Sequence, residues 1–268
     1  ESGKLGKVDY EQAKIWYKKS AENGNSESQY DLGRLYAFGE IGKIDYIEAK
    51  KWWLKAAESN NAEAQNGLGW LYECGKIGQV DYNKAFEWYS KAAENGSSMG
   101  QCNLGRCYDF AMGVKRDYIK AIGWYEKSLQ SDNDNSTTMF YVGQCYEFGK
   151  GVNMSSYMAY LWYKKGADAS ESDAECCFRV GEYHYVKRNP YGVVKTGALL
   201  ALSVIVPVTN VVTIPAAIIG AGANSGMSYK KFVKSEAGKE MMKYYRKAVS
   251  LGHEKARKRL KELEWYEK

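Results

Sequence analysis

Few side chains in this sequence could carry out chemistry. The chain contains only two histidines, His184 and His253, and no Ser–His–Asp arrangement can be proposed around either of them. Cys177 lies seven residues before His184 on the same face of a helix, but two ligands do not make a zinc site. We therefore expect no catalytic residue, no metal and no cofactor, and we expect that the protein is not an enzyme.

Short strings that match enzyme motifs are explained by chance. Ser228–Lys231, Ser131–Asn133 and Lys195–Gly197 match three strings of serine β-lactamases, but the nucleophile string comes last here instead of first. The glycine-rich stretch Gly220–Gly226 is one residue too long for a dinucleotide fingerprint and has no strand and helix around it.

A repeat of 36 residues organises the sequence. Asp-Tyr pairs begin at residues 9, 45, 81 and 117, and aromatic pairs begin at residues 16, 52, 88, 124 and 162. Glycines recur in step with them, at positions 33, 69, 105, 143 and 181. Self-similarity at such a period is typical of proteins built from stacked supersecondary units.

Each repeat is predicted to contain two helices. Asp9 and Asp45 are predicted N-caps, with Gln12 and Glu48 at the capping-box position. Asn-Gly pairs such as Asn23-Gly24 predict the left-handed ends of these helices. A glycine that recurs inside the other helix predicts a close approach, in which the Trp or Tyr of the partner helix packs on backbone.

The residues that recur resemble the Sel-one-like repeat, a relative of the tetratricopeptide repeat. The third repeat shows the pattern best, through Ala64, Leu68-Gly69, Leu71-Tyr72, Gly75, Asp81-Tyr82, Ala85, Trp88-Tyr89, Lys91-Ala92-Ala93 and Gly96. The resemblance covers roughly residues 1–189 and 236–263. It implies an all-α fold, a right-handed α-α solenoid of about six helical-hairpin repeats, and a role as an adaptor that assembles protein complexes.

The repeats are interrupted in two places. Glu1-Ser2-Gly3 aligns with Glu73-Cys74-Gly75, so we expect that the chain begins inside a repeat and belongs to a longer protein. The last full repeat has gained 44 residues between its two helices. We therefore predict repeats over 1–189, a hydrophobic insert over 190–235, and a closing helix with a basic capping helix over 236–268.

The insert contains no charged residue between Lys195 and Lys230. Its apolar run exceeds the roughly 20 residues that span a bilayer, but the two helices that flank it should pair within one repeat, which places both on one side of any membrane. Basic residues at both ends, together with Pro207 and Pro215, favour a hairpin that enters one leaflet. Burial against protein, in the groove or in a homo-oligomer, and a single span are the alternatives. The predicted contact residues are Leu199, Leu200, Leu202, Val204, Ile205, Val206, Ile214, Ile218 and Ile219.

Positions that vary between repeats are free to specify a partner. Two such rows flank the recurring glycines and lie three residues apart, hence on one helix face. Since the resemblance implies that this helix lines the concave side, we predict a groove for an extended protein segment or peptide. The residues are Asp31, Arg34, Trp70, Asn103, Arg106, Tyr141, Gln144, Arg179 and Glu182. An exposed face without a ligand is the alternative.

Charge is concentrated at the C-terminal end. Residues 230–268 contain 13 Lys and Arg against 6 Asp and Glu, a local charge of +7, which leaves −1 for the rest of a chain of net charge +6. Attraction to an anionic membrane surface would therefore come from this end, and nucleic acid is not an expected partner because nothing beyond charge indicates it. The six cysteines do not recur with the repeat, and Cys107 and Cys145 stand where other repeats have Leu. Cys107 and Cys145 are therefore expected to be small buried side chains. The cysteines favour a reducing compartment, and we expect a cytoplasmic protein, with membrane association through the insert as the further expectation.

These features predict a protein-interaction scaffold that an apolar insert tethers to a membrane or to an oligomer partner. The alternative is a membrane-acting effector whose insertion is controlled by binding to the solenoid.

Overall fold

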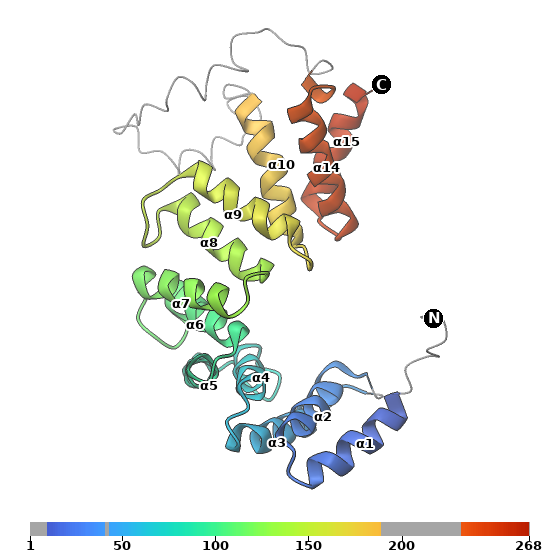
Figure 1. The fold of residues 1–268 in the computed structure, drawn as a ribbon, viewed down its shortest axis with the longest axis vertical. Helices are drawn as coiled ribbons and strands as arrows, with labels where there is room; N and C mark the ends of the chain where they lie inside the picture. The colour runs from blue at the N-terminus through green and yellow to red at the C-terminus, as the bar shows by residue number, and fades with distance from the viewer. Residues whose placement is uncertain (1–9, 41–42, 189–231, 268) are drawn as a thin grey trace. The chain divides into compact units, whose positions relative to one another are not determined.

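The computed structural model describes residues 10–40, 43–188 and 232–267, and in these residues it contains helices and no strand (Figure 1). The helices are α1 (Tyr10–Glu22), α2 (Ser26–Phe38), α3 (Tyr46–Glu58), α4 (Ala62–Glu73), α5 (Tyr82–Glu94), α6 (Ser98–Phe110), α7 (Tyr118–Ser131), α8 (Ser136–Phe148), α9 (Ser156–Asp168), α10 (Ala174–Arg188), α14 (Glu236–Ser250) and α15 (Glu254–Glu267).

The chain divides into two compact units, unit 1 (Glu1–Asn133) and unit 2 (Asp134–Lys268). In unit 1, α2 pairs with α3, α4 with α5 and α6 with α7. In unit 2, α8 pairs with α9 and α10 pairs with α14. The prediction of an all-α solenoid made of helical hairpins is therefore confirmed.

The pairing of α10 with α14 closes a repeat across the long insertion. Gly181 of α10 faces the ring of Tyr245 of α14, as the earlier glycines face their aromatic partners. The helices that flank the insertion thus form one hairpin, as the sequence predicts. Residues 189–231, with every predicted contact residue from Leu199 to Ile219, lie outside the described residues.

Recurring glycines mark the closest helix crossings. A Cβ atom added to Gly69 would lie 2.6 Å from Cδ1 of the Tyr89 ring, and one added to Gly143 would lie 2.5 Å from Cε1 of Tyr163. These distances are far shorter than van der Waals contact, so a side chain cannot be accommodated unless the ring moves. The predicted packing of rings on glycine backbone is confirmed.

In the four pairs α2–α3, α4–α5, α6–α7 and α8–α9, one backbone hydrogen bond closes the loop that joins the helices. The carboxylate of Asp45 accepts hydrogen bonds from the N–H groups of Ile47 and Glu48, both at 3.0 Å, so its role as N-cap is confirmed. The capping box is not completed, because the Asp45 N–H donates instead to the carbonyl of Tyr36 at 2.9 Å. The same bond recurs between Asp81 and Tyr72, at 3.0 Å.

The helices with recurring glycines end in the left-handed conformation. Gly39, Gly75 and Gly149 have φ angles of +69°, +61° and +67° just after α2, α4 and α8. Ala111 takes the equivalent place after α6, with φ of +59°. A residue with a Cβ pays a steric cost in this region that glycine avoids.

Ala111→Gly is therefore expected to stabilise the protein, by about 0.5–1 kcal/mol, because relief of the steric cost exceeds the entropy that glycine loses on folding. The measurement is the urea midpoint of unfolding. A midpoint that stays the same or falls would contradict the assignment of strain to this turn.

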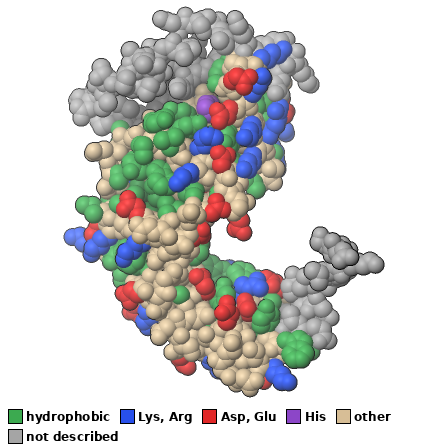
Figure 2. Space-filling model, viewed as in Figure 1, with side chains coloured by type: hydrophobic (Ala, Val, Ile, Leu, Met, Phe, Trp, Pro, Cys, Tyr) green, Lys and Arg blue, Asp and Glu red, His purple; other side chains and the backbone are tan. Residues whose placement is uncertain are grey.

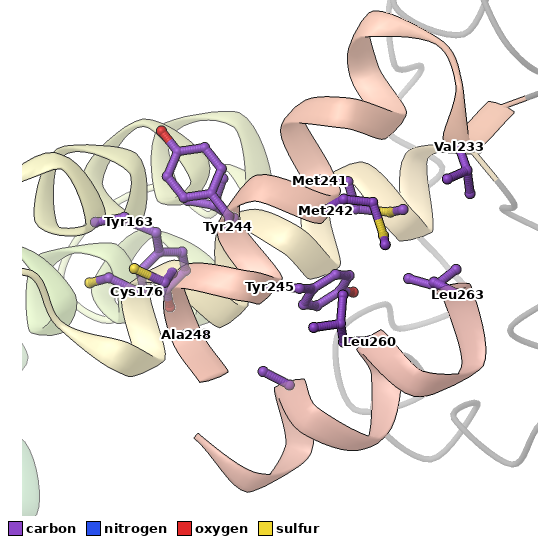
Figure 3. Close-up of a cluster of buried hydrophobic side chains, with 14 of the residues drawn as sticks. Tyr163, Cys176, Val233, Met241, Met242, Tyr244, Tyr245, Ala248, Leu260 and Leu263 are labelled. Carbon is purple, nitrogen blue, oxygen red and sulfur yellow. The ribbon is translucent and has the colours of Figure 1, made fainter. Parts of the chain in front are cut away.

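The core of unit 2 joins α9, α10, α14 and α15. Figure 3 shows the side chains of Tyr245 and Leu260 directed toward each other between α14 and α15, with Met242 and Leu263 beside them. All four are buried. The helix after the insertion is thus held by the repeat before it and by α15 after it.

The cysteines behave as predicted where the structure tests them. All six are free thiols, and Cys107 and Cys145 are fully buried among apolar side chains. Burial raises the pKa of the Cys107 thiol to about 12, with the nearby Glu73 carboxylate adding to the effect. Such a thiol stays protonated and contributes packing.

Candidate partner-binding face

The residues predicted to face a partner all lie on even-numbered helices. Asp31 and Arg34 lie on α2, Trp70 on α4, Asn103 and Arg106 on α6, Tyr141 and Gln144 on α8, and Arg179 and Glu182 on α10. In unit 1, α4 contacts both α2 and α6, and in unit 2, α8 contacts α10. Each unit therefore brings its own share of these residues together, and we call the two sets the even-helix faces of unit 1 and unit 2.

On α2, the polar side chains are held by one another. Nη1 of Arg34 donates to Oε1 of Glu40 at 2.8 Å, and its Nε lies 3.8 Å from a carboxylate oxygen of Asp31. Burial raises the pKa of Asp31, and although Arg34 opposes this shift, the carboxylates of Glu27 and Glu40 add to it. Two carboxylates, those of Asp31 and Glu40, thus hold the Arg34 guanidinium on this part of the face.

Trp70 supplies the aromatic part of the same face. Its ring centroid lies 5.8 Å from that of Phe38 and 6.0 Å from that of Tyr46. Trp70 is half-buried, whereas Phe38 is exposed. The ring is therefore supported from two sides and still reaches solvent, an arrangement typical of interface anchors.

Between α4 and α6, the polar residues form one network. The Asn103 amide donates to Asn66 at 2.9 Å, and Arg106 donates to Asn103 at 2.8 Å and to Glu73 at 2.7 Å. Glu73 also accepts a hydrogen bond from the hydroxyl of Tyr89, at 2.6 Å. Burial, reinforced by Glu73, strongly raises the pKa of Tyr89. Arg106 thus holds two repeats together, and its side chain is only 24% exposed.

The even-helix face of unit 2 is organised in the same way. Arg179 pairs with Glu147 at 3.1 Å and with Glu175 at 2.9 Å. Glu182 accepts hydrogen bonds from Tyr245 at 2.6 Å and from Arg259 at 3.1 Å. Tyr141 packs edge-on against Phe140 at 5.4 Å, and Gln144 is half-buried on α8. Arg179 and Glu182 therefore contribute to the stack of helices.

Sequence reasoning missed the acidic residues that bind the tyrosines. An acid stands four residues after three of the recurring glycines, at Glu73, Asp109 and Glu147. Glu147 accepts hydrogen bonds from Tyr163 and Arg179, as Glu73 does from Tyr89 and Arg106. The acid recurs at the same position of the repeat, and this recurrence could have identified these residues from the sequence.

The two histidines lie at different places in unit 2. His184, partly buried on α10, lies 3.6 Å from Glu240 and stands where other repeats have Tyr. The Ala256 N–H donates to Nδ1 of His253 at 3.1 Å, so Nε2 carries the proton that bonds Glu175 at 2.8 Å. Although burial raises the pKa of Glu175, hydrogen bonds from His253 and Arg179 outweigh it and hold this pKa below its usual value. Within the described ranges, no three His, Cys, Asp or Glu side chains gather as metal ligands would.

The described helices also give one finding on membrane crossing. No helix in residues 10–40, 43–188 and 232–267 is both long enough and apolar enough to cross a bilayer.

Comparison with known proteins settles the family. The model of the Sel1 repeat matches residues 1–25, 26–61, 62–97, 98–133, 136–171 and 242–253. The chain belongs to the Sel1 repeat family. Four of the matched stretches begin at or next to the first residue of α2, α4, α6 or α8 and contain the helix that follows it. The last match lies on α14, beyond the insertion.

Solved structures of other Sel1 repeat proteins share the fold. A protective antigen of uropathogenic Escherichia coli strains is 27% identical with a TM-score of 0.60, and the alignment covers 95% of this chain but 44% of the antigen. This chain thus spans less than half the length of that protein. A Sel1 repeat protein from Oxalobacter formigenes is 31% identical with a TM-score of 0.58, over 66% of this chain and 70% of that one.

No curated protein sequence matches the chain. Sel1 repeat proteins are generally protein-interaction scaffolds.

Proposed function

We propose that this Sel1 repeat protein is a scaffold whose even-helix faces hold an extended segment of a partner protein. In this proposal, the apolar insert attaches the scaffold to a membrane or to another subunit. One observation carries the proposal: the side chains that differ between repeats gather on α2, α4 and α6, already fixed by intramolecular contacts. Binding to such a surface orders few side chains, so little of the binding free energy is lost.

The chemistry of the unit 1 face suits an extended protein segment. Trp70 and the exposed ring of Phe38 offer an apolar contact for a side chain of the partner. Asp31 and Arg34 offer an acceptor and a donor beside it. Aromatic rings and arginines are the residue types most often found at the centres of protein interfaces.

The hairpin of α10 and α14 supports attachment through the insert. Because these two helices pair, both ends of residues 189–231 start from one side of the scaffold. A segment that leaves and returns on one side, and has no charge between Lys195 and Lys230, suits a hairpin better than a single span. The division into repeats over 1–189, insert over 190–235 and closing helices over 236–268, and a cytoplasmic location, belong to this proposal.

The groove is tested by selecting a random dodecapeptide library on the whole protein. The affinity of the selected peptides is then measured for the unchanged protein and for the variants Arg34→Glu and Trp70→Ala. Each change is expected to weaken binding about tenfold or more, because truncating a central anchor typically costs over 1 kcal/mol. Arg106 is left unchanged, because its bond to Glu73 supports the fold.

Lys51→Glu serves as the matched control. Lys51 is exposed and lies on α3, away from the even-helix face. Its substitution by Glu reverses the same charge as Arg34→Glu does. It is expected to leave the affinity unchanged. Peptides that bind both face variants as well as the unchanged protein would place the binding site elsewhere.

A further inference from the structure

An exposed apolar surface in unit 2 is not accounted for by the partner-binding face. Met154, Tyr157 and Leu161 lie before and along α9 and have exposed fractions of 51%, 53% and 37%. Beneath them, the ring of Tyr160 lies 6.5 Å from that of Tyr157 and stacks at 4.2 Å on Tyr183 of α10. We call these five residues the α9 patch. Figure 2 shows hydrophobic side chains gathered over the region of α8 and α9.

Stacking of the repeats does not require the exposed leucine of this patch. The position of Leu161 is occupied by Lys51 in α3, Glu87 in α5 and Gly123 in α7, so a leucine there is particular to α9. The position of Tyr160 is also apolar in α5 and α7, and Tyr160 packs against the core of unit 2. The exposed apolar surface that Met154, Tyr157 and Leu161 form above it is typical of an interaction site.

The charge of unit 2 indicates what covers the patch. Residues 134–268 hold 20 Lys and Arg against 13 Asp and Glu, a net charge of +7, whereas unit 1 carries −1. All of this excess comes from residues 230–268, whose helix α14 packs against α10. Tyrosines beside apolar side chains suit the boundary between lipid headgroups and acyl chains, where one end of the ring is wet. A positive unit with such a patch complements an anionic lipid surface.

Tyr183 brings the patch close in sequence to the insertion. Tyr183 is on α10, five residues before Arg188, where the first described part of unit 2 ends. The apolar sequence that follows and the patch therefore start from the same end of one helix.

We infer that the α9 patch is a membrane-contact surface that docks unit 2 on anionic lipid beside the insert. This inference rests on the membrane form of the proposed attachment, but it assigns lipid contact to described residues on α9 and predicts an effect separate from that of the insert.

Flotation on vesicles of phosphatidylcholine and phosphatidylserine (7:3) tests the inference. The patch variant carries Met154→Ser, Tyr157→Ser and Leu161→Ser in the whole chain. It is expected to need about tenfold more lipid for half-maximal binding, since three partly exposed apolar side chains no longer leave water. These side chains are on the surface, so circular dichroism and the melting temperature should be unchanged.

The control variant carries Ile44→Ser and Ile47→Ser, at the equivalent positions before and in α3. These side chains are as exposed as the patch residues, at 54% and 65%, but lie in unit 1. The control is expected to bind lipid like the unchanged chain. If the control loses as much lipid binding as the patch variant, the inference is wrong, because any exposed apolar side chain would then contribute equally to lipid binding.

Deletion of residues 192–229 separates the inference from the proposed tether. If the deletion abolishes flotation and the patch variant floats normally, the tether stands and the α9 patch is not a lipid contact. If the unchanged chain does not float but forms a dimer that the patch variant loses, the patch is a protein interface and the inference is wrong. Weakened flotation in both variants supports it.

Discussion

Replacing Gly69 with alanine is expected to destabilise the protein by about 3 kcal/mol, at the upper end of what overpacking costs in a core. The new Cβ atom would lie 2.6 Å from Cδ1 and Cε1 of Tyr89. That ring is fully buried and its hydroxyl is bound to Glu73, so it cannot swing away without losing a hydrogen bond. The helices α4 and α5 must therefore separate.

Gly123→Ala provides the matched control with the opposite sign. Gly123 also lies inside a helix, α7, but a Cβ atom there would meet nothing within 4 Å. Alanine is then expected to stabilise the protein by about 0.5–1 kcal/mol through its better helix propensity.

Urea unfolding followed by circular dichroism measures both changes, and amide hydrogen exchange should locate the loss for Gly69→Ala in α4 and α5. Equal effects of the two substitutions would show that the recurring glycines are not closest-approach points.

The fold was predictable because its determinants are local and recur. Asp45 caps its helix through bonds to residues two and three positions away, and four of the five rings lie against a glycine 20 residues earlier in the sequence. The constant register also predicted that α10 and α14 pair across the insertion.

The detail of the candidate site was less predictable. The spacing predicted nine partner-facing residues on the helices that carry the recurring glycines, but it did not show that Arg106 binds Glu73, 33 residues earlier. Which side chains meet across neighbouring helices depends on the offset between the helices, and the periodicity of one helix does not contain that offset.

One pattern in the sequence did carry this information. The ring that lies on the recurring glycine is a tyrosine in α5, α7 and α9, and each time an acid stands four residues after that glycine. In α3 the ring is Trp53, and the position of the acid is Ala37. The indole N–H of Trp53 donates to the carbonyl of Tyr30 at 3.0 Å, so it needs an acceptor on the backbone and no carboxylate. The identity of the ring and the identity of the acid position are thus coupled by hydrogen bonding in α3, α5 and α9. The ring on Gly181 departs from this pattern, because Tyr185 stands at the acid position and the Tyr245 hydroxyl donates to Glu182 at 2.6 Å.

Glu73→Leu is expected to destabilise the protein by about 3 kcal/mol, because it leaves a mostly buried guanidinium and a buried hydroxyl without their acceptor. Glu73 accepts from Arg106 at 2.7 Å and from Tyr89 at 2.6 Å. Arg106→Leu is expected to cost about 2 kcal/mol, since Glu73 keeps the Tyr89 hydroxyl as a partner. The double variant is expected to lose about 2 kcal/mol less unfolding free energy than the two single variants lose when their losses are added, because neither charge is left alone.

The exposed pair of Glu48 and Lys51 on α3, at 3.2 Å, is the control cycle. Its coupling, measured with Glu48→Ala and Lys51→Ala, is expected to stay below about 0.5 kcal/mol, because water screens both groups. Urea unfolding of the six variants and the unchanged protein gives both couplings. Equal couplings would mean that Glu73 and Arg106 contribute little to the stack and that both remain available to a partner. A large coupling at Glu73 and Arg106 alone would assign Arg106 to the fold, and partner binding on unit 1 would then depend mainly on Arg34 and Trp70.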